Sequence, residues 1–158
     1  GMGQAICILV GQRLGGDQPA VAERTTYTGF AWMLGYMGVV AAVYTLLPRT
    51  LVGLFRGDAE VEQYEAMAAL MPGLLACVAI YSLAEAGNFA FAFALRGAGD
   101  TKFVSRLTFV LGWPVMVIPT LIAVKSGASL YWAWGFATAY IFVMAVCFYL
   151  RFRGGKWK

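Results

Sequence analysis

The sequence predicts an all-α polytopic membrane protein, built as a transmembrane helix bundle. The first observation is composition, because 61% of the residues are hydrophobic, only 13% are charged, and the mean hydropathy is +0.71. Such a balance lies far from that of an average soluble domain. The second is a set of four long stretches that are uncharged or nearly so, each long enough to cross a hydrocarbon core that takes about 20 helical residues. The expected spans are 25–48, 66–95, 107–124 and 126–150, followed by a basic tail over 151–158.

A fifth apolar stretch, 1–12, opens the sequence and has only about half the length of a span. We interpret it as the end of a helix whose beginning lies outside these residues. A secretory signal peptide is disfavoured, because no basic segment precedes the stretch and no small-residue cleavage site with a soluble domain follows it.

The loop after this stretch, "GQRLGGDQPAVAER", carries helix-stop and helix-start chemistry. Gly15 and Gly16 can adopt a positive φ at a helix C-terminus, and Asp17 can cap the next helix before Pro19. The loop is therefore expected to be a tight turn.

The segment "LRGAGDTKFVSR" repeats this pattern, with Gly97 and Gly99 at the turn and Asp100 or Thr101 as the cap. It does not match a phosphate-binding loop, which needs the G-x-x-x-x-G-K-[ST] spacing after a strand.

Pro72, Pro114 and Pro119 lie inside the expected spans, where each removes one intrahelical hydrogen bond and tends to bend the helix. Bent helices accompany transport pathways, but prolines are also frequent in transmembrane helices generally. Both readings stay open.

Basic residues alternate between the loops in two groups of nine and three, which is a clear positive-inside bias. The larger group is expected on the cytoplasmic side, which places this multi-pass chain in the cell (inner) membrane with its C-terminus inside. The net charge of +4 belongs to this asymmetry, and we expect no nucleic-acid partner. The larger group is Arg13, Arg24, Arg96, Lys102, Arg106, Arg151, Arg153, Lys156 and Lys158, and the smaller is Arg49, Arg56 and Lys125.

The sequence contains no histidine, the commonest metal ligand and general base, and its cysteines Cys7, Cys77 and Cys147 all lie inside apolar stretches without C-x-x-C spacing. They are interpreted as small buried apolar side chains. We therefore expect no metal site, no structural disulfide and no cofactor.

One carboxylate, Glu85, lies within an otherwise uncharged span, ten residues before Leu95. At about 1.5 Å per residue it is roughly 15 Å deep, near the middle of the hydrocarbon. An ionised carboxylate facing lipid there would cost several kcal/mol, so it is expected to face the protein interior or a water-filled cavity.

Tyr81, Ser82 and Asn88 share a helix face with Glu85 and add two hydroxyls and an amide. These oxygen donors suit a hard cation such as Na⁺, whereas burial of the carboxylate would favour loading of H⁺. The alternative is a permanently protonated or paired glutamate that holds helices together.

Two segments of the sequence, together with its C-terminal end, resemble a known family. The segments "GMGQAICILVGQRLGGDQPAVAER" and "ALRGAGDTK", with a tryptophan near the end, resemble the C-terminal half of multidrug and toxic compound extrusion (MATE) transporters of the NorM-like branch. The resemblance covers nearly the whole chain. The matching motif loop comprises Leu95, Arg96, Gly97, Gly99 and Asp100.

The resemblance implies a twelve-helix exporter of two six-helix lobes, of which this chain supplies part of one. Residues 1–12 would end the eighth helix, and the four spans would be helices nine to twelve. The partners would be the N-terminal lobe and the seventh helix, which carries the family's other cation-site acid, together with small-molecule drugs and the bilayer.

The resemblance also assigns a role to Glu85. In the NorM-like branch an acidic residue of the tenth helix, eleven positions before the arginine of L-R-G, belongs to the cation site, and Glu85 stands eleven positions before Arg96. That branch usually has aspartate there, so the choice between Na⁺ and H⁺ stays open. The implied function is cation-coupled antiport of amphipathic, mostly cationic drugs, not catalysis.

Three other functions compete. A lipid-linked oligosaccharide flippase of the same superfamily would favour basic residues inside the spans, whereas this chain has one acid there. An intramembrane aspartyl protease is suggested by "GAGD" at 97–100, but such enzymes need a second aspartate, commonly after tyrosine, and no Tyr-Asp pair occurs. A passive scaffold segment would tolerate replacement of Glu85.

Overall fold

The protein is described by a computed structural model that covers residues 1–54 and 61–157, with only the backbone described at residue 54 and at 61–67. Every regular element in these ranges is helical, which confirms the all-α prediction. The elements are α1 (Met2–Gly15), α2 (Pro19–Leu46), α3 (Pro48–Leu54), α4 (Val61–Gly97), α5 (Thr101–Leu111), the π-helical segment η1 (Gly112–Val117), α6 (Ile118–Lys125) and α7 (Leu130–Arg153).

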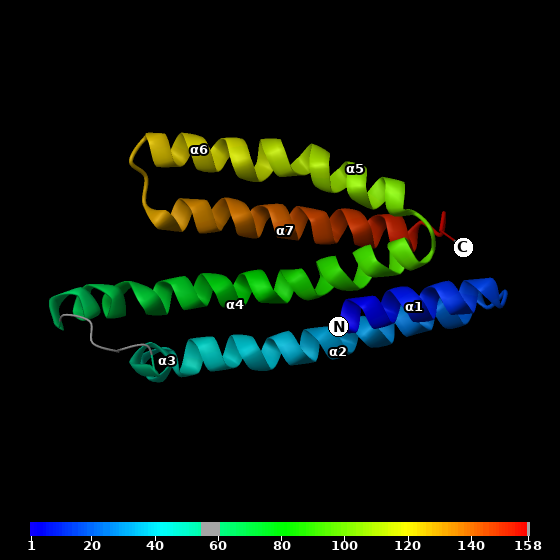
Figure 1. Ribbon diagram of the computed structural model, residues 1–158, viewed down its shortest axis with the longest axis horizontal. Helices are drawn as coiled ribbons and strands as arrows, with labels where there is room; N and C mark the ends of the chain where they lie inside the picture. The colour runs from blue at the N-terminus through cyan, green and yellow to red at the C-terminus, as the bar shows by residue number, and fades with distance from the viewer. Residues whose placement is uncertain (55–60, 158) are drawn as a thin grey trace.

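The long helices run alongside one another with α4 in the middle of the bundle (Figure 1). α2 packs against α4 on one side and α7 packs against it on the other, while α1 contacts both α2 and α4. The run α5–η1–α6 is outermost and packs mainly on α7. The central helix is therefore the one that carries Glu85.

Four segments of the described chain are long and apolar enough to cross a membrane: Pro19–Leu46, Ala68–Gly97, Thr101–Lys125 and Leu130–Arg153. No more than 11% of the most apolar window of any of them is buried within the chain. Large apolar side chains point outward instead, such as Trp32, 71% exposed, and Phe109, 72% exposed. Exposing so much apolar area to water would cost a large free energy, so this surface is suited to contact with lipid or with other helices.

The helices and the expected apolar stretches have different bounds. α2 begins at Pro19, before the expected span, because its first turns include charged residues, which an uncharged stretch leaves out. α7 begins at Leu130, whereas the expected span began at residue 126. A turn separates α6 from α7, in which Gly127 has a φ of 69° and the Ala128 amide donates to the Ala123 carbonyl at 2.9 Å. This bond closes the helix end in the Schellman manner.

The turn between α1 and α2 differs from the expected one. Asp17, not Gly15 or Gly16, takes the left-handed conformation with a φ of 56°, and Gly16 has a φ of −94°. The Gln18 amide donates to the Arg13 carbonyl at 2.9 Å, so the left-handed position is the one just before Gln18. Aspartate tolerates this conformation better than most residues, and Gln18 rather than Asp17 precedes α2 as its N-cap.

Prolines occupy three different helical settings. Pro72 lies inside α4, Pro119 lies in the first turn of α6, and Pro114 lies in the π-helical segment η1. A proline ring clashes with the carbonyl four residues earlier, and the wider π turn relieves this clash without ending the helix. The α5–η1–α6 run thus continues as one span, Thr101–Lys125.

The two groups of basic residues lie at opposite ends of the bundle. The α1–α2 turn, the α4–α5 turn and the end of α7 come together at the right of Figure 1, and the α6–α7 turn and α3 lie at the left. The described members of the larger group, which are all except Lys158, belong to the first end, and Arg49 and Lys125 belong to the second. Arg56 and Lys158 lie outside the described residues.

The packed core is concentrated at the basic end. Phe91 of α4 lies at its centre, with ring centroids 5.3 Å from Phe30, 5.2 Å from Tyr149 and 5.5 Å from Phe152. These contacts join α2, α4 and α7. The largest fully buried side chains are Phe148, Phe152, Leu95, Val10, Val104 and Thr26.

Candidate functional site

Glu85 lies near the middle of the Ala68–Gly97 span and is half-buried. The Tyr81 hydroxyl donates a hydrogen bond to Glu85 Oε1 at 3.0 Å. The two residues are four apart, so one turn of α4 brings them together without any other helix. The structure thus joins two of the four predicted site residues directly.

Tyr81 is oriented from outside its own helix. Its ring meets Trp134 of α7 edge to face, with centroids 6.5 Å apart and an interplanar angle of 85°. This contact restricts the rotamers of Tyr81, so α7 helps to aim the hydroxyl at Glu85. The sequence analysis did not identify Trp134 as a residue of this site.

Ser82 and Asn88 have different settings on the same helix. The Ser82 hydroxyl donates to the Val78 carbonyl at 2.8 Å, so its hydrogen is used within α4. The Asn88 amide oxygen Oδ1 is buried and has no hydrogen-bond partner among the described residues. An unsatisfied buried acceptor costs about 1–3 kcal/mol. It is therefore an acceptor available to a cation or a donor that this part of the chain does not supply.

The direction of Glu85 follows from the packing around Gly87. A Cβ at Gly87 would lie 3.6 Å from Phe30 of α2 and 3.7 Å from Ala145 of α7, so both neighbouring helices meet α4 there. Two residues correspond to about 200° of rotation around a helix. By helical geometry Glu85 therefore lies on the opposite face of α4 from Gly87, next to Tyr81, whose ring contacts Trp134 of α7.

The predicted motif loop closes the end of α4. Gly99 has a φ of 84°, and the Asp100 amide donates to the carbonyl of the fully buried Leu95 at 2.9 Å. Arg96 places its guanidinium over the Phe93 ring, 5.1 Å from the centroid. In the structure this loop is a helix end fixed by backbone hydrogen bonds.

Gly97 belongs to the helix rather than to the turn, where the sequence placed it. A Cβ at this position would collide with the Cys7 backbone carbonyl of α1. Glycine here lets the backbones of α1 and α4 approach closely.

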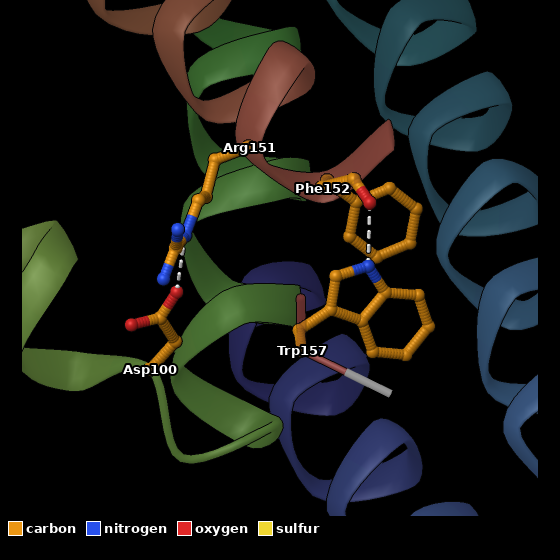
Figure 2. Close-up of polar contacts among 4 residues, drawn as sticks. All are labelled: Asp100, Arg151, Phe152 and Trp157. Carbon is orange, nitrogen blue, oxygen red and sulfur yellow. Dashed lines mark hydrogen bonds and ion pairs between the residues drawn. The ribbon is translucent and has the colours of Figure 1, made fainter. Parts of the chain in front are cut away.

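Asp100 has a tertiary role that no local pattern predicts. It precedes α5 as the N-cap residue, yet in the described structure its carboxylate makes no capping bond to that helix. Arg151 Nε of α7 donates to Asp100 Oδ2 at 2.7 Å (Figure 2). The Arg151 guanidinium also lies 4.8 Å from the Phe103 ring centroid. The loop is therefore fastened to the last turns of α7.

The tail after α7 folds back onto the bundle. Trp157 stacks on Phe152 with centroids 4.5 Å apart at 9°, and its indole Nε1 donates to the Phe152 carbonyl at 2.5 Å (Figure 2). Trp157 is only 5% exposed, so the basic tail is not simply a solvated charge run. The signal in the sequence that could have indicated a packed tail is this single tryptophan among lysines and glycines.

No three His, Cys, Asp or Glu side chains gather in a way that could hold a metal ion within residues 1–53 and 68–157, whose side chains the structure describes. Cys7, Cys77 and Cys147 are free and half-buried. The polar chemistry in the middle of the spans is that of Glu85 and its neighbours.

Comparison with known proteins decides the family. The sequence model of the MatE family matches residues 1–122, a range that includes Glu85 and the motif loop. The chain belongs to the MatE family. This confirms the resemblance read from the sequence, and the α7 helix lies beyond the matched range.

Three relatives of this MatE-family chain have names that refer to multidrug extrusion or multidrug resistance. It is 28% identical to "Multidrug and toxin extrusion protein 2" of Oryctolagus cuniculus over 162 residues, covering 100% of the chain and 26% of the relative. It is 31% identical to "Probable multidrug resistance protein NorM" of Mannheimia succiniciproducens over 138 residues, which cover 83% of the chain and 28% of that relative. It is 28% identical to "Multidrug resistance protein PmpM" of Pseudomonas aeruginosa over 114 residues, which cover 72% of the chain and 23% of that relative.

This MatE-family chain therefore matches about a quarter of the length of these curated relatives. No solved structure gave a significant match.

Proposed function

We propose that this chain is part of a cation-coupled efflux transporter that exports amphipathic, mostly cationic compounds. The family supports transport rather than catalysis as the function, and the names of the relatives support multidrug extrusion. The observation that carries the coupling proposal is the hydrogen bond from Tyr81 to Glu85 in the middle of the central span.

Glu85 is the proposed binding group for the coupling ion, either Na⁺ or H⁺. The Tyr81 hydroxyl holds one carboxylate oxygen, Oε1, which leaves Oε2 and the hydroxyl lone pairs for a cation. The unsatisfied Asn88 Oδ1 and the Ser82 oxygen are supporting ligands of the right chemistry for Na⁺. A proton would instead occupy the carboxylate itself.

Coupling requires that ion and drug prefer different states of the protein. The proposed mechanism is alternating access, in which the ion bound at Glu85 and the drug bias two orientations of a cleft in opposite directions. Glu85 lies on the opposite face of α4 from Gly87, the position where α2 and α7 both meet α4, and this placement suits a cleft shared with another part of the transporter. The proposed partners are an N-terminal lobe and a seventh helix, with the C-terminus of this chain on the cytoplasmic side of the inner membrane.

The flippase alternative is less favoured by the charge inside the spans. A pyrophosphate-linked substrate needs cations in the cavity, whereas Glu85 is the one charged residue of the four expected spans. An acid favours a cationic cargo or ion instead.

The test is ethidium efflux from cells that lack their own pumps, using the full coding sequence that contains these residues. Glu85→Gln is expected to lower the efflux rate at least tenfold at equal membrane expression, since the amide cannot carry the ion's counter-charge. Asp17→Asn is the matched control, because it removes a carboxylate from a loop while asparagine tolerates the same left-handed backbone. Repeating the assay with and without Na⁺ separates the two ions. Unchanged efflux in Glu85→Gln would make the carboxylate structural.

A further inference from the structure

A groove between α5 and α7 lies at the basic end of the bundle. It consists of two adjoining hollows of about 370 and 380 Å³, which share Phe103, Leu107 and Arg151 as lining residues. We call it the α5–α7 groove. It is remote from Glu85 and plays no part in the proposed coupling.

The mouth of the α5–α7 groove is cationic. Lys102 and Arg106 line one hollow, Lys156 lines the other, and all three side chains are exposed. The carboxylate of Asp100 also lines the first hollow, but Arg151 already neutralises it at 2.7 Å. Since this pair cancels, the three remaining cations set the sign of the local field.

The walls of the α5–α7 groove become apolar towards the membrane span. Leu107 and Val110 line the α5 side and Leu150 lines the α7 side. Val110 is 62% exposed and Leu150 is 58% exposed, so this wall lies open along the outer surface of the described chain. A cationic mouth above an open apolar wall complements a molecule with an anionic head and hydrocarbon chains.

We propose that the α5–α7 groove binds an anionic phospholipid. The phosphate would lie among Lys102, Arg106 and Lys156, and an acyl chain would cover Leu107, Val110 and Leu150. Basic pockets between membrane helices attract anionic headgroups, and long basic side chains at helix ends can extend to the headgroup level. A free phosphate ion would use the cations but leave the apolar wall uncovered.

The binding test uses the purified protein in detergent and native mass spectrometry with dioleoylphosphatidylglycerol as the probe. Lys102→Gln with Arg106→Gln is expected to weaken binding of this lipid between about tenfold and thirtyfold, at roughly fivefold for each cation near the surface. Arg49→Gln with Lys125→Gln is the matched control, because it removes one arginine and one lysine from the other end of the bundle. The control is expected to stay within about twofold of the unmodified protein.

Further arms separate the possible sources of the effect. Dioleoylphosphatidylcholine, which has no net charge, should bind weakly and equally to all variants, and millimolar inorganic phosphate should not displace the phosphatidylglycerol. Equal losses in both double variants, equal binding of the two lipids, or displacement by phosphate would each overturn the proposal. If the first double variant does not fold, as judged by helical circular dichroism, Lys156→Gln alone takes its place, because this exposed tail residue follows the last helix. It is expected to give about a fivefold loss, and no loss would overturn the proposal.

Discussion

Asp100 and Arg151 are 51 positions apart in the sequence, yet Arg151 Nε lies 2.7 Å from Asp100 Oδ2. The two side chains are 18% and 28% exposed, so water screens the pair only in part. Through this contact the loop that ends α4 is held against α7, the same helix whose Trp134 orients Tyr81.

Asp100→Asn is expected to lower the stability of the protein by about 1–2 kcal/mol, because a partly buried charge-assisted hydrogen bond is lost. Thermal unfolding in detergent measures the effect. Arg151→Gln should give a similar loss, and the double variant should lose little more than either single variant because the two residues share one interaction. Additive losses would show that the pair contributes no coupling energy. Arg153→Gln serves as the control, since this nearby arginine is exposed.

Trp157→Ala should release the C-terminal tail. The indole is 5% exposed and stacked on Phe152, so its loss is expected to cost about 3 kcal/mol of local stability. Limited trypsin digestion reports the release, because cleavage after Arg153 and Lys156 should become faster. Trp132→Ala, which truncates a 60% exposed tryptophan, should leave the digestion rate unchanged. Equal digestion in both variants would contradict a docked tail.

Gly97→Ala should separate α1 from α4. The added Cβ would collide with the Cys7 carbonyl, and a backbone atom cannot turn aside as a side chain can. We expect a loss of about 2 kcal/mol or more in thermal unfolding. Gly38→Ala in α2 has nothing within 4 Å of the new methyl group and should be neutral or slightly stabilising. A stable Gly97→Ala protein would mean that α1 does not approach this closely.

Tyr81→Phe should weaken ion coupling without unfolding the protein. Removing the hydroxyl deletes the 3.0 Å hydrogen bond to Glu85 but keeps the ring contact with Trp134. The rate of ethidium efflux is expected to fall roughly three- to tenfold, with a shift in the ion concentration that gives half-maximal efflux. Tyr131→Phe is the control, because that hydroxyl is a 3.5 Å donor to the Leu70 carbonyl away from Glu85. A shift of the same size in both variants would remove Tyr81 from the proposed site.

Much of the site was predictable because the signals are local. The depth of Glu85 follows from counting residues along a helix, and its contact with Tyr81 follows from the spacing of four. The setting of Asn88 did not follow, because whether its amide oxygen finds a donor depends on which other helices lie nearby. Trp134 escaped notice for the same reason, since its partner Tyr81 lies on another helix.

The amino-acid sequence by itself determined that the chain is a bundle of membrane-spanning helices, that basic residues gather at one end, and that one carboxylate lies in the middle of a span. These features depend on hydropathy and helical rise, which are properties of consecutive residues. The tertiary structure alone decided that Asp100 pairs with Arg151, that Gly97 meets Cys7, and that a cationic groove forms between α5 and α7. Those contacts join residues far apart in the chain, so they depend on how the helices pack against one another, which hydropathy and spacing do not specify.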